Sequence, residues 1–156
     1  TKEPIEGAVG IAMWTKNRGL FGGFELSTYT AKAVEGVSDK EGILNFPSVS
    51  GSYAISTPHV KVYKPGYVGW DSEHIYLGHH PNDKKRMISK RRENFVMNDQ
   101  EIFLKQWRKK FTHTSHGYII SLSNDIHEAG IENSKYREII RYEEPLRSLE
   151  RSLLEK

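Results

Sequence analysis

The sequence contains no cysteine among its 156 residues. This excludes disulfide bonds, thiolate nucleophiles and cysteine-ligated zinc or iron–sulfur centres. It also lacks any run of about 18 apolar residues, the length that a membrane-spanning helix needs. Hydrophobic residues make up 37% of the chain and charged residues 28%, a composition typical of a folded, fairly polar protein. A chain of this length can hold one domain, or a small domain with an extension.

Positive charge is present in slight excess and is unevenly distributed. The net charge is +3, and acids and bases roughly balance as far as Leu77. The excess lies in three clusters, Lys84–Arg86, Lys90–Arg92 and Arg108–Lys110. Such clusters can bind phosphates, but they more often form solvated loops and helix faces. We therefore expect no nucleic-acid partner.

The clearest local signal is the segment Val37-Ser-Asp-Lys-Glu-Gly-Ile-Leu-Asn-Phe-Pro47. It predicts a strand, a tight turn and a second strand. The turn is predicted because Asp39 can hydrogen-bond the backbone two residues on and Gly42 tolerates a positive φ. Leu44 and Phe46 alternate with polar residues, so one face of the second strand should be apolar.

Other segments with the period of a strand lie on both sides of this turn. In a first predicted strand, Pro4–Trp14, apolar residues share one face and small residues occupy the other. Small residues indicate that a neighbour packs closely on that face, or that the strand is buried on both faces. Further strands are predicted over residues 26–38, 53–55 and 58–67. Short strands with turns at this spacing are typical of a small antiparallel sandwich.

Three motifs in this half carry a family resemblance: Pro4-Ile-Glu-Gly-Ala-Val9, Val37-Ser-Asp-x-x-Gly-x-Leu-x-Phe-Pro47 and Val60-x-Val-Tyr-Lys-Pro-Gly-Tyr67. Over roughly residues 4–77 the chain resembles the carboxypeptidase regulatory-like domains. In those, a glycine-bearing first strand is followed by a Thr-Asp-x-x-Gly-x-Phe turn and a closing Gly-Tyr strand. Here Ser38 replaces the threonine and Leu44 replaces the aromatic residue.

The resemblance implies a transthyretin-like, or prealbumin-like, β-sandwich of about seven strands. It also implies a non-catalytic module of an exported protein, without a cofactor, whose partner is another protein or an envelope component. An extracytoplasmic location would follow, in the periplasm, at the cell surface or secreted, and a start at Thr1 is consistent with a targeting segment upstream. The similarly folded hydroxyisourate hydrolases end in Tyr-Arg-Gly-Ser. This chain ends Ser152-Leu-Leu-Glu-Lys156, which does not support that activity.

The second half has a different pattern. A polar, basic linker is predicted over residues 78–97, followed by helices over 98–156. The first helix would start at Asn98, where Asn98-Asp-Gln-Glu101 has capping-box spacing, and would present one apolar stripe. That stripe consists of Ile102, Phe103, Trp107 and Phe111.

Two further helical segments are predicted beyond a break at 113–117. One runs from Tyr118 towards Gly130, a plausible C-terminal cap. The next is capped by Ser134 and is kinked or restarted at Pro145. The predicted fold is therefore α+β: an antiparallel β-sandwich in residues 1–77, then a helical extension of two or three helices packed on it.

The candidate ligand-binding residues are Tyr63, Lys64, Tyr67 and Trp70, which lie around one predicted turn. If exposed, these aromatic side chains would form a platform for a peptide or a carbohydrate. Packing within the strands is the alternative explanation, because aromatic residues are common there.

Histidines are the other residues with potential chemistry. A metal could be held by the His79–His80 pair with Asp71 or Glu73, or by His113 with His116. Adjacent histidines on loops lack the ordered spacing of catalytic zinc sites, so we expect no metal site. No carboxylate pair or Ser–His arrangement defines a catalytic set.

Three functions remain open on the sequence alone. The first is a non-catalytic exported module for protein interaction or envelope assembly. The second is a binding domain that holds a peptide or carbohydrate on the aromatic cluster. The third is a metal-dependent hydrolase at the junction of sandwich and helices, where histidine and acidic side chains would converge in a cleft.

Overall fold

Antiparallel sheet and helices make up the structure, a computed structural model that describes residues 3–19, 27–78, 87–93, 95–122, 129 and 131–154. The elements are β1 (Val9–Arg18), β2 (Ser27–Val37), the 3-10 turn η1 (Gly51–Tyr53), β3 (His59–Tyr63), β4 (Trp70–Asp71), β5 (His74–Tyr76), β6 (Ser89–Arg91), α1 (His113–Ile120), α2 (Lys135–Ile140) and α3 (Glu143–Leu154). None of the helices in these ranges is both long and apolar enough to cross a membrane.

The main sheet has four antiparallel strands in the order β2-β1-β3-β4, and β5 pairs with β6 in a separate ladder. This confirms the α+β class with antiparallel strands. The predicted sandwich of about seven strands is not confirmed. The predicted turn forms at Asp39, and Gly42 has a positive φ of 76°, but the Asp39 side chain accepts from Ile43 N, four residues on, at 2.8 Å and not from the residue two positions on. Ile43–Phe46, however, is not a strand of either sheet. The strand predicted over residues 53–55 does not form either, because Tyr53 ends the 3-10 turn Gly51–Tyr53 and residues 54 and 55 continue as a turn.

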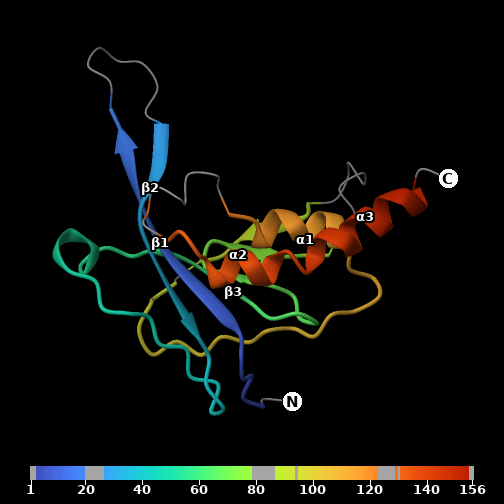
Figure 1. Ribbon diagram of the computed structural model, residues 1–156, viewed down its shortest axis with the longest axis horizontal. Helices are drawn as coiled ribbons and strands as arrows, with labels where there is room; N and C mark the ends of the chain where they lie inside the picture. Colours follow the sequence, from blue (N-terminus) through green and yellow to red (C-terminus); the bar gives the residue numbers. More distant parts are fainter. Residues whose placement is uncertain are drawn as a thin grey trace.

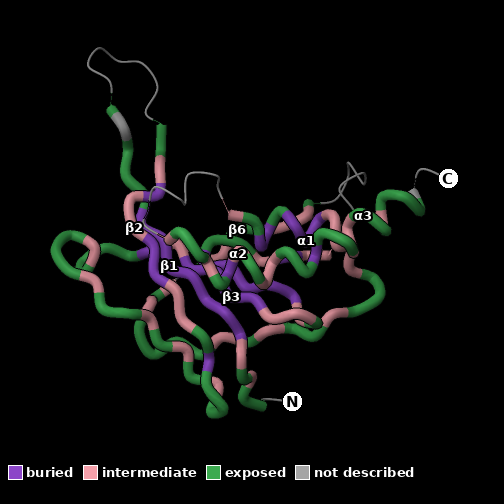
Figure 2. The backbone as a smooth tube through the Cα atoms, viewed as in Figure 1, coloured by how far each residue is buried: buried purple, intermediate pink, exposed green. Residues whose placement is uncertain are grey.

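Both faces of the main sheet are buried. Successive side chains of β1 and β3 point to opposite faces, and each face packs against other parts of the chain. On one face Val9, Ile11 and Met13 pack with Ile120 and Tyr136 of the helices. Figure 1 shows the helices over this face, where α1 contacts β3 and β4 and α2 contacts β1 and β3. On the other face lie the small and apolar residues Ala8, Ala12, Trp14, Val60 and Val62. Figure 2 shows β1 and β3 as the buried centre of the molecule. Of the two alternatives predicted for the first strand, a close neighbour or burial on both faces, the structure shows burial on both faces.

The helix predicted from Asn98 does not form. Residues 95–111 instead run as irregular chain, and Val68 N donates to Lys105 O at 2.7 Å while Trp107 N donates to Gly66 O at 2.9 Å. Ile102 and Leu104 reach the second face of the sheet, so this segment has the period of a strand. The backbone pairing with residues 66–68 outweighs the weak helical preference of the sequence.

The other helix predictions fare better. Ser134 caps α2 as predicted, since its side chain accepts a hydrogen bond from Arg137 N at 2.9 Å. The chain restarts as α3 at Glu143, with Pro145 in the first turn, where a missing N–H costs little. The break expected at 113–117 is wrong, because α1 begins at His113 behind the cap residue Thr112. Residues 123–128 and 130 of the predicted Tyr118–Gly130 helix lie outside the described residues.

Two paired glycines let the chain after the Asp39 turn cross the sheet at close range. Gly10 of β1 pairs with Gly36 of β2, and both face the second side of the sheet. A Cβ at Gly36 would lie 2.2 Å from the backbone oxygen of Asn45. A Cβ at Gly10 would lie 2.5 Å from the end of the Leu44 side chain, which can move. A side chain at position 36 should therefore be tolerated less well than one at position 10.

Gly36→Ala should lower the free energy of unfolding by about 1–3 kcal/mol, because overpacking must displace backbone. Gly10→Ala is the matched comparison and should cost less, because a leucine side chain can rotate away. Urea titration of both variants measures the difference. Equal losses, or a larger loss for Gly10→Ala, would contradict this packing.

Candidate functional site

The polar face of β3 lies beneath the helices rather than in solvent. His59 Nε2 lies 3.0 Å from Asp71 Oδ1, and Lys61 Nζ lies 3.2 Å from Asp71 Oδ2. Lys61 also donates to the Ile119 carbonyl of α1 at 2.5 Å. Burial opposes ionisation of Asp71, but the His59 hydrogen bond and the Lys61 charge hold its pKa well below its usual value. Asp71 thus links β4 to β3, and Lys61 links β3 to α1.

A second buried carboxylate, Glu143, joins β3 to α1. Glu143 is 2% exposed, and its Oε1 accepts a hydrogen bond from Tyr63 Oη at 2.6 Å. His113 Nδ1 lies 2.5 Å from Oε2, and His116 Nδ1 lies 3.5 Å from Oε1. Burial opposes ionisation, but the contacts with His116, Tyr63 and His113 outweigh it and lower the pKa of Glu143 to about 2. Glu143 is therefore an ionised side chain in the interior.

The side chains of this cluster are mostly buried and contact one another. His116 is fully buried, and its Nε2 accepts a hydrogen bond from Gly69 N at 2.8 Å. Ser115, which precedes His116 in the sequence, has its Oγ within hydrogen-bond distance of Tyr76 Oη, at 2.7 Å. His113 is partly exposed but stacks on Trp107, with ring centroids 4.3 Å apart. Within the described ranges no three metal-binding side chains are arranged to hold an ion, and His79 and His80 lie outside those ranges.

The four predicted binding residues do not share one surface. Tyr63 is fully buried under the helices, and Trp70 is 7% exposed on the opposite face of the sheet. Trp70 packs edge-on against Phe95. Lys64 donates to the Glu6 carbonyl at 2.8 Å, and Tyr67 pairs with Gln106. The exposed aromatic platform expected from the sequence is therefore wrong, because two of its side chains are core residues.

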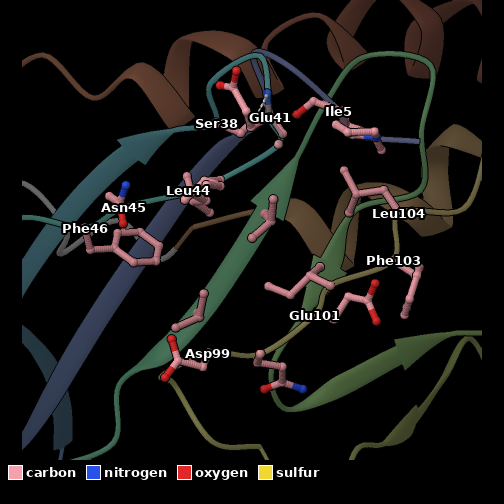
Figure 3. A pocket seen from close by; sticks show the side chains of 18 of the residues that line it. Ile5, Ser38, Glu41, Leu44, Asn45, Phe46, Asp99, Glu101, Phe103 and Leu104 are labelled. Carbon is pink, nitrogen blue, oxygen red and sulfur yellow. Dashed lines mark hydrogen bonds between the residues drawn. The ribbon is translucent and has the colours of Figure 1, made fainter. Parts of the chain in front are cut away.

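An opening large enough for a ligand lies on the other face of the sheet. It is a cavity of about 740 Å³, here called the groove, with a floor of Ala8, Val60 and Val62. One wall is the chain at 41–46 and the other is the chain at 95–104. Figure 3 shows Leu44 and Phe46 on one side and Glu101 and Leu104 on the other, with the strands of the main sheet behind.

The rim of the groove is acidic although the chain is basic overall. Four exposed carboxylates lie along it, from Glu3, Glu41, Asp99 and Glu101. Among the described residues that line the groove there is no lysine, arginine or histidine. The net charge of the whole chain is +3, so this negative rim is a local feature. Charges of one sign around a concave site raise the local concentration of oppositely charged ligands.

Sequence reasoning found one part of the groove and missed the rest. It predicted an apolar face for Leu44 and Phe46, and both side chains do pack on the sheet. The four carboxylates come from three separate segments, which no spacing rule connects. Period-2 alternation at Ile102 and Leu104 was the available signal for the second wall.

Comparison with known proteins gives no match for this chain: no family model, no curated protein and no solved structure is significantly similar to it. The likeness of its motifs to carboxypeptidase regulatory-like domains therefore stays a prediction from the sequence. The groove and the buried polar network are the features from which a function can be inferred.

Proposed function

We propose that the protein is a non-catalytic interaction module that holds a segment of a partner polypeptide in the groove. The observation that supports this most directly is the groove itself, an apolar floor of sheet residues enclosed by two stretches of irregular chain. Its volume, about 740 Å³, lies in the range of ligand-binding sites.

Exposed apolar side chains at the mouth support the same proposal. Ile43, on the first wall, is 53% exposed, and Phe103, on the second, is 51% exposed. Apolar side chains grouped beside a concave surface are typical of binding sites, because a bound segment removes them from water. Each would then contribute roughly 25 cal/mol for every Å² of apolar surface buried.

A polypeptide is favoured over a carbohydrate, and binding over catalysis. The groove presents an aliphatic floor, carboxylates and the phenylalanines Phe46, Phe95 and Phe103, with no tryptophan or tyrosine among its described lining residues. Tyr63 and Trp70, which were suggested as part of a sugar platform, are buried. The histidine and acidic side chains that converge at the sheet–helix junction bind one another. The motif resemblance supports a further proposal, that this module belongs to an exported protein and acts outside the cytoplasm.

Selection from a library of random peptides displayed on phage tests this proposal. Peptides enriched on the wild-type protein should lose at least about tenfold in binding to Ile43→Asp, because this change places a charge at the apolar mouth. Leu149→Asp is the matched control on α3, where the leucine is 60% exposed, and it should bind them unchanged. Peptides that bind all three proteins equally would contradict the proposal.

A further inference from the structure

We infer that the groove takes an extended segment in which apolar residues alternate with lysine or arginine, bound as a strand alongside a wall of the groove. This inference rests on the proposed function of the groove and specifies the chemistry of its occupant. Its support comes from the backbone of the walls, their rigidity and the charge of the rim.

The first wall has the geometry of a strand with an open edge. Leu44 and Phe46 point to the sheet, while Asn45 between them is exposed. None of these residues takes part in a backbone hydrogen bond within the part of the chain that the structure describes. The carbonyl of Asn45 faces Gly36 of β2, so the other N–H and C=O groups of this segment are the ones that can pair with an incoming strand, as in the recognition of peptides by sheet edges.

The second wall repeats this alternation. Ile102 and Leu104 pack on the same cluster as Leu44 and Phe46, while Glu101 is exposed. The walls thus resemble two strands of an incomplete second layer over the main sheet. A strand placed between them would direct alternate side chains to the apolar floor and the others to solvent.

The first wall is also held in place before any ligand binds. The close crossing of Asn45 over Gly36 places its backbone directly on β2. The turn that leads into it is anchored by Asp39, which accepts from Ile43 N at 2.8 Å. Binding to such a wall costs little ordering of the protein, which favours affinity.

The rim determines which residues suit the solvent-facing positions of the ligand. Glu41 and Glu101 lie on opposite walls, and Asp99 lies near the second wall (Figure 3). Lysine or arginine can cover apolar surface with its stem while its charge reaches these carboxylates. An acidic segment would be repelled by the same groups, and salt would weaken the attraction because the carboxylates are exposed.

The probe is a fluorescent peptide of about eight residues in which valine and lysine alternate. Its binding is measured by fluorescence anisotropy. A peptide of the same length that alternates valine and glutamate is the comparison. We expect the lysine peptide to bind at least about tenfold more tightly at low salt. The double variant Glu41→Gln/Glu101→Gln should weaken binding about three- to tenfold. Glu132→Gln/Glu144→Gln, which removes two exposed carboxylates outside the groove, should not.

Backbone pairing has a separate test. The lysine peptide is N-methylated at every valine in one version and at every lysine in the other. If the peptide pairs through its backbone with the first wall only, the N–H groups of one parity face that wall and those of the other parity do not. One version should therefore lose binding and the other should retain it. Equal binding of the two N-methylated versions would overturn the inference, and so would equal binding of the lysine and glutamate peptides. Neither result would affect the proposed function, which the peptide library tests separately.

Two other outcomes bear on the occupant. Self-association of the wild-type protein that Ile43→Asp abolishes would assign the groove to a second copy and overturn the inference of a partner segment. Failure of the library to enrich any groove-dependent peptide would instead overturn the proposed function, and the inference with it.

Discussion

Replacement of Glu143 with alanine should lower the free energy of unfolding by about 3–5 kcal/mol, as measured by urea titration. The change removes the hydrogen bond from Tyr63 and leaves His113 and His116 beside an empty space in the interior. Loss of one partner from a buried charged cluster is costly because the remaining polar groups cannot return to water.

Glu144→Ala is the matched control for this prediction. Glu144 is the next residue, in the same first turn of α3, and it is exposed. Both carboxylates lie near the positive end of the helix dipole, so both variants lose that interaction. Because Glu144→Ala loses no buried contact, its free energy of unfolding should fall by less than about 1 kcal/mol. Similar losses for Glu143→Ala and Glu144→Ala would show that Glu143 contributes as a surface charge and that the buried cluster does not stabilise the fold.

Acid should destabilise the protein between pH 4.5 and about 2, the usual and the folded-state pKa of Glu143. Because the folded-state pKa is the lower one, the unfolded chain takes up the proton first. The stabilisation is therefore complete above pH 4.5 and is lost as the pH falls through the folded-state value. The pKa of Asp71 is also lowered, so its contribution is lost in the same direction, with falling pH.

Glu143→Gln isolates the part of this acid sensitivity that belongs to one carboxylate. The variant keeps the size of the side chain but does not titrate, so its free energy of unfolding should fall less steeply over the same pH range. Urea titrations at a series of pH values provide the comparison. Parallel curves for the wild type and Glu143→Gln would show that Glu143 is not the group that titrates.

Local patterns predicted much of the sheet. Alternation along the first strand gave its two faces correctly, because side chains on a strand point alternately to each side. The Asp39 turn and the Ser134 cap depend on neighbouring residues only, and both are present. Ile43–Phe46 has the predicted apolar face but no ladder, because it crosses over Gly36 instead of lying beside β2.

The segment after Asn98 shows why periodicity alone was insufficient. Ile102, Phe103 and Trp107 fit a helix, while Ile102 and Leu104 fit a strand, and both patterns are present in the same residues. The hydrogen bonds to residues 66–68 decide between them, and these come from a part of the chain far away in sequence. Such tertiary contacts cannot be read from a local window.

The candidate sites depended even more on distant contacts. Tyr63 and Glu143 are 80 residues apart in sequence yet share a hydrogen bond. A usable signal did exist, because His59, Lys61 and Tyr63 form a polar face on a strand next to the centre of the sheet. Polar groups in such a place need buried partners. The buried partners of His59, Lys61 and Tyr63 lie on the face of the sheet that the helices cover. The groove lies on the other face.

The central claim is that a partner segment binds in the groove. The most direct measurement is an amide NMR titration of the isotope-labelled protein with the valine–lysine peptide. We predict saturable shifts centred on the walls, at Leu44, Asn45, Phe46 and Ile102, with few in α1 or α3. Shifts centred on the helices, or no shifts at peptide concentrations well above those of the protein, would contradict it.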